Sequence, residues 1–64
     1  MLVQFYSGEG HAAIFHHHKM VAKLPDCDSR LETDIRLRKL GWRRRGKWKR
    51  TEWGSEAKLR KKTL

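Results

Sequence analysis

The residues best suited to chemistry in this chain are cations interleaved with aromatic rings. Six basic side chains and three tryptophans lie between Trp42 and Trp53. Lys and Arg neutralise phosphates, while a tryptophan either packs in a core or stacks on an unpaired base. The segment therefore predicts a surface that binds a polyanion.

The positive charge is concentrated in the second half of the chain. Residues 1–34 carry three Lys and Arg against five Asp and Glu, whereas residues 35–64 carry thirteen against two. Self-repulsion on this scale opposes a compact fold, so a surface that is merely solvated would not need it. The asymmetry indicates a nucleic acid or another anionic partner, and the sign of the charge excludes a DNA mimic.

The other reactive or metal-binding side chains do not form a recognised site. The four histidines are His11 and residues 16–18, and Cys27 is the only cysteine. Because their spacing lacks the two close pairs of a zinc site, we do not expect a metal, and we interpret the histidines at 16–18 as surface residues. Nucleophile-elbow, phosphate-loop and zinc-protease motifs are absent from the sequence. We expect a protein that is not an enzyme and that has no metal or other cofactor.

The best-defined element is a helix over residues 29–40, just before the basic segment. Ser29 and Glu32 form the capping box S-x-x-E, and Gly41 suits the stop at the other end. Asp34 and Arg38 are four residues apart, in the order that favours an ion pair on the helix surface. This helix should hold the basic segment beside its end.

Residues 42–53 have the pattern of a β-hairpin. If Arg44, Arg45 and Gly46 form a three-residue loop, the glycine takes the left-handed position of the turn. Trp42 then lies opposite Trp48, as an aromatic pair across the two strands. This pairing predicts a rigid, arginine-rich loop.

The remaining segments are interpreted as elements that support the helix and the basic hairpin. Residues 2–7 have the composition of a short strand, which is expected to pair with the hairpin. Residues 11–24 fit a helix, although a second strand joined through residues 7–10 is the alternative. Pro25 ends that element. Ser55 suits the cap of a short basic helix to about residue 62, which would fray until a partner is bound.

A helix that ends in Leu-Gly-Trp before an arginine-rich hairpin resembles the recognition helix and wing of small winged helix-turn-helix domains from phages and plasmids. The resemblance is confined to residues 29–53, and it implies that the helix faces the major groove while the hairpin holds phosphates. Residues 1–24 depart from the family, because they offer at most one of its two preceding helices. The residues expected to bind nucleic acid are Arg36, Lys39, Arg43, Arg44, Arg45, Lys47, Lys49, Arg50, Lys58 and Lys61.

Small basic ribonuclease toxins of the HicA type are similar at the same Leu-Gly-Trp step. They use a histidine after a glycine-serine step. Here Gly54 and Ser55 are followed by Glu56, and no histidine follows His18. The catalytic element of that family is therefore missing.

These observations predict one small α+β domain over residues 1–64. It is expected to be winged-helix-like, with residues 1–24 as support, the helix and basic hairpin at 29–53, and a basic C-terminal helix within 55–64. The expected function is non-catalytic nucleic-acid binding, with duplex DNA favoured. One alternative is a phage-type host-takeover or inhibitor protein that binds a host protein through its basic face, and another is a binder of RNA or single strands through an exposed tryptophan. With no signal peptide and no membrane-spanning stretch in the sequence, we expect a cytoplasmic protein.

Overall fold

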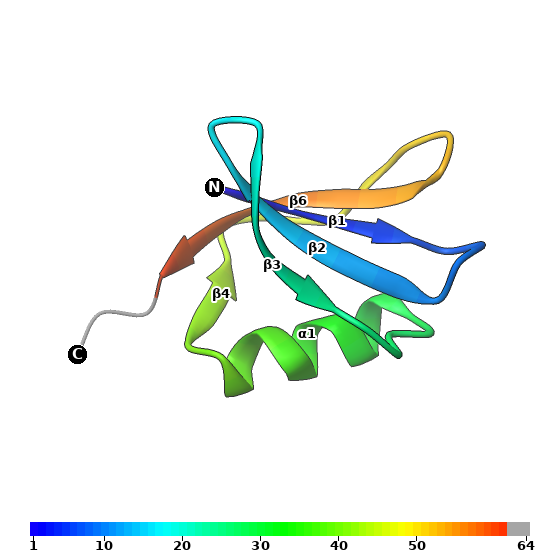
Figure 1. The fold of residues 1–64 in the computed structure, drawn as a ribbon, viewed down its shortest axis with the longest axis horizontal. Helices are drawn as coiled ribbons and strands as arrows, with labels where there is room; N and C mark the ends of the chain where they lie inside the picture. The colour runs from blue at the N-terminus through cyan, green and yellow to red at the C-terminus, as the bar shows by residue number, and fades with distance from the viewer. Residues whose placement is uncertain (62–64) are drawn as a thin grey trace.

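One antiparallel sheet with a helix across one of its faces makes up the protein (Figure 1). The computed structural model describes residues 1–61. Within them the strand order is β3-β2-β1-β6-β4, and β5 also pairs with β6. The elements are β1 (Leu2–Tyr6), β2 (His11–His16), β3 (Lys19–Leu24), α1 (Arg30–Lys39), β4 (Trp42–Arg44), β5 (Lys49–Arg50) and β6 (Gly54–Lys61).

Two consecutive hairpins form the first half of the sheet. Tyr6 begins the first turn, where its carbonyl accepts hydrogen bonds from the backbone N–H groups of Glu9 and Gly10 at 3.1 and 3.0 Å. The second turn is made by His17 and His18, whose φ angles are 49° and 65°. The helix expected over residues 11–24 is therefore wrong, and the alternative of a second strand joined through residues 7–10 is confirmed. Ala12 and Ile14 lie on the same side of β2 and both belong to the core cluster, as the period of two in a strand allows.

The capped helix is confirmed close to its expected bounds. The Ser29 hydroxyl accepts a hydrogen bond from the Glu32 backbone N–H at 3.1 Å. Gly41 follows the helix with a φ of 88°, the left-handed conformation that suits a glycine at this stop. Thr33 and Leu37 are the buried residues of the helix, so this side of α1 packs on the sheet.

The hairpin lies further along the chain than expected. Its turn runs from Thr51 to Gly54, where the Thr51 backbone N–H donates to the Gly54 carbonyl at 2.9 Å. Trp42 pairs with Lys61 instead of Trp48, so the expected loop at 44–46 is wrong. Residues 42–50 instead run along β6 as two short pieces, β4 and β5, that both pair with it.

The C-terminal helix expected from Ser55 is also wrong, because residues 54–61 form the longest strand. Ser55, Ala57 and Leu59 are buried, whereas Lys58, between the last two, and Arg60, after Leu59, are exposed. This alternation fits a strand with one face on a core. Residues 62–64 of the expected tail lie outside the described residues.

The winged-helix fold is contradicted by this topology. The part of the chain that the structure describes has a single helix, and that helix packs on the face of a six-stranded sheet. β1 does not pair with residues 42–50 but lies between β2 and β6, at the centre of the sheet. One strand and one helix were expected before α1, and the structure has three strands there instead.

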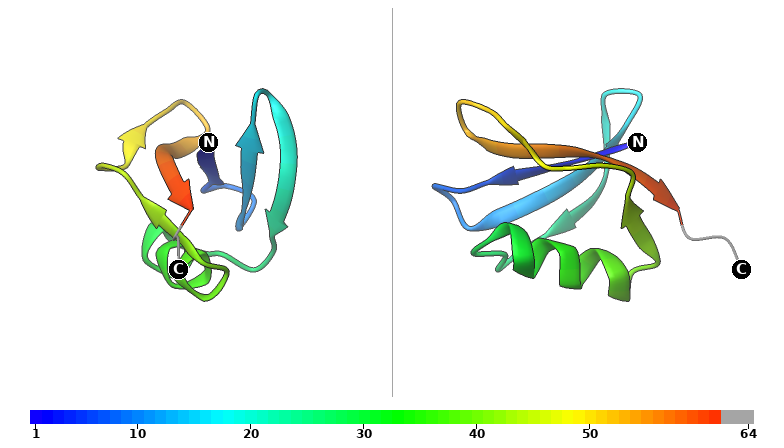
Figure 2. Two further views of the ribbon diagram at one scale, coloured as in Figure 1. Left: turned by 90° about the vertical axis from the view of Figure 1, so that its left-hand side faces the viewer. Right: turned by 180° about the vertical axis from the view of Figure 1, so that it is seen from behind.

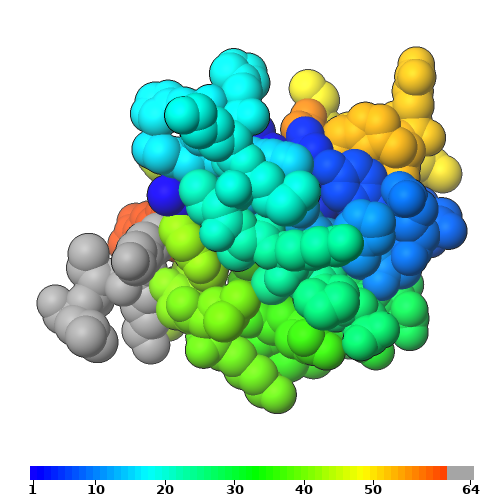
Figure 3. All heavy atoms as spheres, in the orientation of Figure 1, coloured from blue at the N-terminus to red at the C-terminus, as the bar shows by residue number. Residues whose placement is uncertain are grey.

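The core lies between the sheet and α1. Val3, Phe5, Ile14 and Leu37 are at most 4% exposed, and fully burying side chains of this size contributes about 1.5–3 kcal/mol each. On the side shown in Figure 3, the end of β3 and the segment after it lie directly against α1. The rest of the cluster is Ala12, Leu24, Cys27, Ala57 and Leu59, with Trp42 and Trp48 packed against it.

Candidate nucleic-acid interface

The sheet has a second face that α1 does not cover, here called the open face. Side chains alternate along a strand, and because Val3 and Phe5 point to the core, Leu2, Gln4 and Tyr6 point to the open face. Both the β2–β3 turn and the β5–β6 turn rise beyond the sheet on this side, away from α1 (Figures 1 and 2). The N-terminal start of β1 lies between them (Figure 2, left).

Cations gather on the open face along β6. Arg45, Lys47, Lys49 and Lys58 line one hollow of about 330 Å³, together with the single carboxylate of Glu56. These four cations are called the basic margin. A hydrogen bond of 2.8 Å from the Arg45 backbone N–H to the Lys58 carbonyl fixes the loop against the strand. The margin therefore has a defined position on the sheet.

Two further arginines lie toward the end of β6, and one of them, Arg43, also lines a hollow of about 670 Å³ beside α1, with Arg38 and Arg44. Arg43 and Arg60 are paired across β4 and β6, so their side chains leave the sheet on the same side. Arg60 is two residues from Lys58 on β6 and shares its face. Like charges placed opposite one another destabilise a sheet, which favours an anion between them. Arg60 was not among the residues expected from the sequence.

A second, larger hollow adjoins the basic margin. Its volume is about 490 Å³, and it shares Leu2, Arg45 and Lys58 with the first hollow. Phe15, which is paired with Leu2 across β1 and β2, contributes an aromatic ring. His17 and His18 line it from the β2–β3 turn. The two hollows thus form one trough, with apolar residues beside cations.

An aromatic cluster occupies the other end of β1. The ring of Tyr6 lies between those of His11 and Trp53, at centroid distances of 5.0 Å to each. The Tyr6 hydroxyl donates a hydrogen bond to the Gln4 side chain at 2.5 Å. Burial raises the pKa of the Tyr6 phenol above its ordinary value, and the Glu9 carboxylate raises it further. Trp53 remains 39% exposed, so its ring is accessible from solvent.

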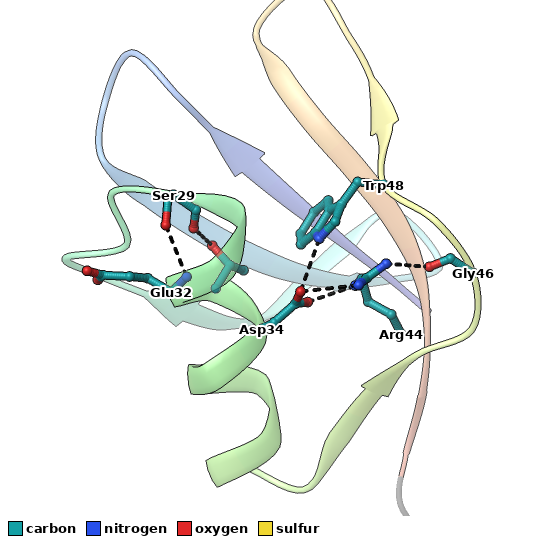
Figure 4. Close-up of polar contacts among 7 residues, drawn as sticks. Ser29, Glu32, Asp34, Arg44, Gly46 and Trp48 are labelled. Carbon is teal, nitrogen blue, oxygen red and sulfur yellow. Dashed lines mark hydrogen bonds and ion pairs between the residues drawn. The ribbon is translucent and has the colours of Figure 1, made fainter.

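Arg44, by contrast, points to the helix side of the sheet (Figure 4). Its Nε and Nη2 atoms donate to the two carboxylate oxygens of Asp34 at 2.7 and 3.2 Å. Its Nη1 atom donates to the Gly46 carbonyl at 2.7 Å, and its guanidinium lies 5.5 Å from the centre of the Trp48 ring. Most of the donors of Arg44 are therefore already engaged within the protein.

The remaining predicted residues do not join the open face. Arg36 and Lys39 lie on α1, which covers the opposite face of the sheet. Residues two apart on a helix project about 200° apart, so Arg36 also points away from the side on which Asp34 holds Arg44. Arg50 is paired with Ser55, whose side chain is buried on the helix side. The backbone of Lys61 pairs with Trp42.

The open face also contains residues that the sequence did not single out: Leu2 and Phe15 in the trough, and Tyr6 in the aromatic cluster. The period-2 pattern of residues 2–7 places Leu2 and Tyr6 on one side of a strand. Nothing in the sequence says which strands flank it, so the pattern alone does not bring these side chains beside the cations.

Within residues 1–61 no group of three His, Cys, Asp or Glu side chains is placed to hold a metal ion. No helix in this part of the chain is long and apolar enough to span a membrane. The chain matches no known family model, no curated protein and no solved structure.

Proposed function

We propose that this protein is a non-catalytic nucleic-acid-binding protein and that its binding surface is the open face of the sheet. The observation that carries the proposal is the basic margin, in which four cations surround one hollow beside a single carboxylate. Four cations around one hollow repel one another, and a row of phosphates relieves that repulsion.

The fold removes part of the basis on which the sequence favoured duplex DNA. That expectation depends on the helix and an arginine-rich loop meeting the same duplex. Arg36 and Lys39 lie on α1, and Arg44 is bound to Asp34 on the helix side. The open face keeps Arg43, Arg45, Lys47, Lys49 and Lys58 from the expected set, and adds Arg60.

Salt dependence gives the first test. If the four margin cations each contact a phosphate, raising the salt from about 50 to about 200 mM should weaken binding by about 10²-fold. Fluorescence anisotropy with labelled DNA and RNA oligonucleotides measures this change. If no nucleic acid binds at about 50 mM salt, the proposal is overturned.

A matched pair of variants locates the surface. The margin variant carries Lys47→Ala, Lys49→Ala and Lys58→Ala, and the helix variant carries Arg36→Ala, Arg38→Ala and Lys39→Ala. Both variants lose three positive charges, so long-range attraction falls equally in the two. We expect the margin variant to lose more than tenfold in affinity and the helix variant to lose less than about threefold.

Equal losses in the two variants would contradict the assignment to the open face. A larger loss in the helix variant would place the interface on α1 instead. Circular dichroism of both variants checks that the fold is retained. All six positions are exposed or half-buried, so truncation removes little packing.

A further inference from the structure

The centre of the open face has a different chemistry from its margin. β1 presents Leu2, Gln4 and Tyr6 there, and none of these side chains carries a charge at neutral pH. With Phe15 and Trp53 beside them, they form a strip that is called the β1 lane. The lane runs next to β6, whose Lys58 is paired with Leu2. An uncharged aromatic strip thus lies directly beside a row of cations.

The lane offers two separate places for a flat, aromatic ligand. At one end, Leu2 and Phe15 line the larger hollow, which also contains Arg45 and Lys58. At the other end, the accessible ring of Trp53 lies against Tyr6, with the ring planes inclined by 40°. The four-residue separation of Leu2 and Tyr6 along the strand corresponds to about 13 Å.

Resting on the proposed function, we propose that the open face takes single-stranded nucleic acid. Unpaired bases stack on the β1 lane, at Trp53 and Tyr6 and in the hollow at Phe15. The sugar-phosphate backbone follows the basic margin along β6. Aromatic rings accept any base in this way, since every base has a π-face, and cations beside them hold the backbone.

The shape of the face favours a single strand over a duplex. Both hairpin turns extend beyond the sheet on this side, and the start of β1 lies between them (Figures 1 and 2). In a duplex the faces of the bases are covered by stacking, and only their edges are exposed in the grooves. Aromatic rings on this face can meet base faces only when the bases are unpaired and splayed out.

The charged side chains of the protein determine where the bases and the phosphates of the bound nucleic acid lie. Glu9 is close enough to Tyr6 to affect the titration of its phenol, so a phosphate at that end would be repelled. Lys49 of β5 is paired with Glu56 of β6, and Lys58 lies two residues after Glu56 on β6. Phosphates are therefore held on the β6 side of the lane, while the Tyr6 end receives a base.

The test compares three ligands of equal length, of which the two single strands carry the same number of phosphates and the duplex carries twice as many. They are a single strand of mixed sequence, the corresponding duplex, and an abasic strand that keeps the backbone without the bases. Single-stranded DNA and RNA are both used, because a 2′-hydroxyl contact would separate them. We expect the strand with bases to bind at least tenfold more tightly than the abasic strand, and more tightly than the duplex.

Trp53→Ala is the matching variant, because this side chain is exposed and its loss should leave the core intact. Loss of one stacked base corresponds to about a 5- to 150-fold weaker affinity for the strand with bases. Affinity for the abasic strand should stay the same. Trp53→Phe, which retains a ring, should recover most of the loss, and Leu31→Ala on the exposed side of α1 serves as the control.

Two results would overturn the single-strand assignment and leave the proposed function standing. One is a duplex that binds as tightly as the single strand. The other is an affinity that is equal with and without bases and is insensitive to Trp53→Ala. In both cases the cations alone would account for binding. Failure of every ligand to bind would instead remove the proposed function itself.

Discussion

Asp34 of α1 binds Arg44 of β4 through both carboxylate oxygens, at 2.7 and 3.2 Å. The same carboxylate accepts a hydrogen bond from the Trp48 indole N–H at 3.4 Å. One acidic side chain therefore joins the helix to the segment that connects β4 with β5 (Figure 4). That segment also carries Arg45 and Lys47, so the ion pair on the helix side of the sheet helps to position part of the basic margin on the open face.

The first prediction is that breaking this pair destabilises the protein. Both side chains keep about a quarter to a third of their surface, at 26% and 30%, so water screens the pair. We expect Asp34→Asn and Arg44→Ala each to lower the free energy of unfolding by about 1 kcal/mol. Urea denaturation of the single and double variants gives the coupling energy, with Arg38→Ala as the control. Additive losses would show that the two residues do not stabilise one another.

Helix capping gives the second prediction. Ser29→Ala removes the hydroxyl that accepts from the Glu32 backbone N–H, and it should lower the free energy of unfolding by about 1 kcal/mol. Ser29→Asp keeps an acceptor and places a negative charge at the positive end of the helix, so it should retain most of the stability. Thermal and urea denaturation measure both. A loss below about 0.2 kcal/mol for the alanine variant would contradict the cap.

The third prediction concerns the close approach of β1 and β6 at Gly54. A Cβ atom there would lie 2.0 Å from the carbonyl oxygen of Phe5, which belongs to the backbone and cannot rotate away. Gly54→Ala should therefore lower the free energy of unfolding by more than about 2 kcal/mol. Gly8→Ala is the matched control, because a Cβ at position 8 meets nothing within 4 Å. Similar stabilities of the two variants would be incompatible with this packing.

The fourth prediction is an alkaline transition at Tyr6, the only tyrosine. Its pKa is raised in the folded state, by burial first and by Glu9 second. A raised pKa favours the neutral phenol in the folded protein, so stability is retained below pH 10 and falls as the pH rises through the folded-state pKa. Ultraviolet absorbance of tyrosinate follows the titration. Glu9→Gln should lower the pKa toward the ordinary value, and an unchanged pKa would contradict the role of Glu9.

Local signals in the sequence predicted the helix well. Ser29 and Gly41 act within a few residues, and each has its expected role at an end of α1. The expected pair of Asp34 with Arg38 shows the limit of such signals. Asp34 instead pairs with Arg44, ten positions away, which reaches it only because β4 lies beside the helix.

The sheet was harder to predict, because its strands are joined by contacts between distant residues. The segment from Ser55 to Lys61 is rich in residues with good helix propensity, yet Ala57 and Leu59 are buried on alternate positions in β6. The neighbours that impose this alternation are Val3 and Arg44, far away in sequence. A tertiary environment of this kind overrides propensity.

The candidate site was likewise predictable where local signals suffice and not where contacts between distant residues decide. The run of cations at 43–50 identified the margin, because charge is visible in the composition of a segment. The sequence did not show that these cations divide between the two faces of the sheet, since the face of Arg44 or Arg50 depends on the register with β6. Tyr6 and Phe15 were missed because an aromatic residue in a strand is usually part of a core.

The pairing of β1 with β6 has a consequence for how the protein is made. β1 is the first of the described elements to be synthesised and β6 is the last, so the central strand lacks one of its two neighbours until residues 54–61 have emerged from the ribosome. A nascent chain that stops before Gly54 carries an unpaired edge on β1 and lacks the buried side chains of Ala57 and Leu59. The sheet therefore cannot be completed until residues 54–61 have been synthesised.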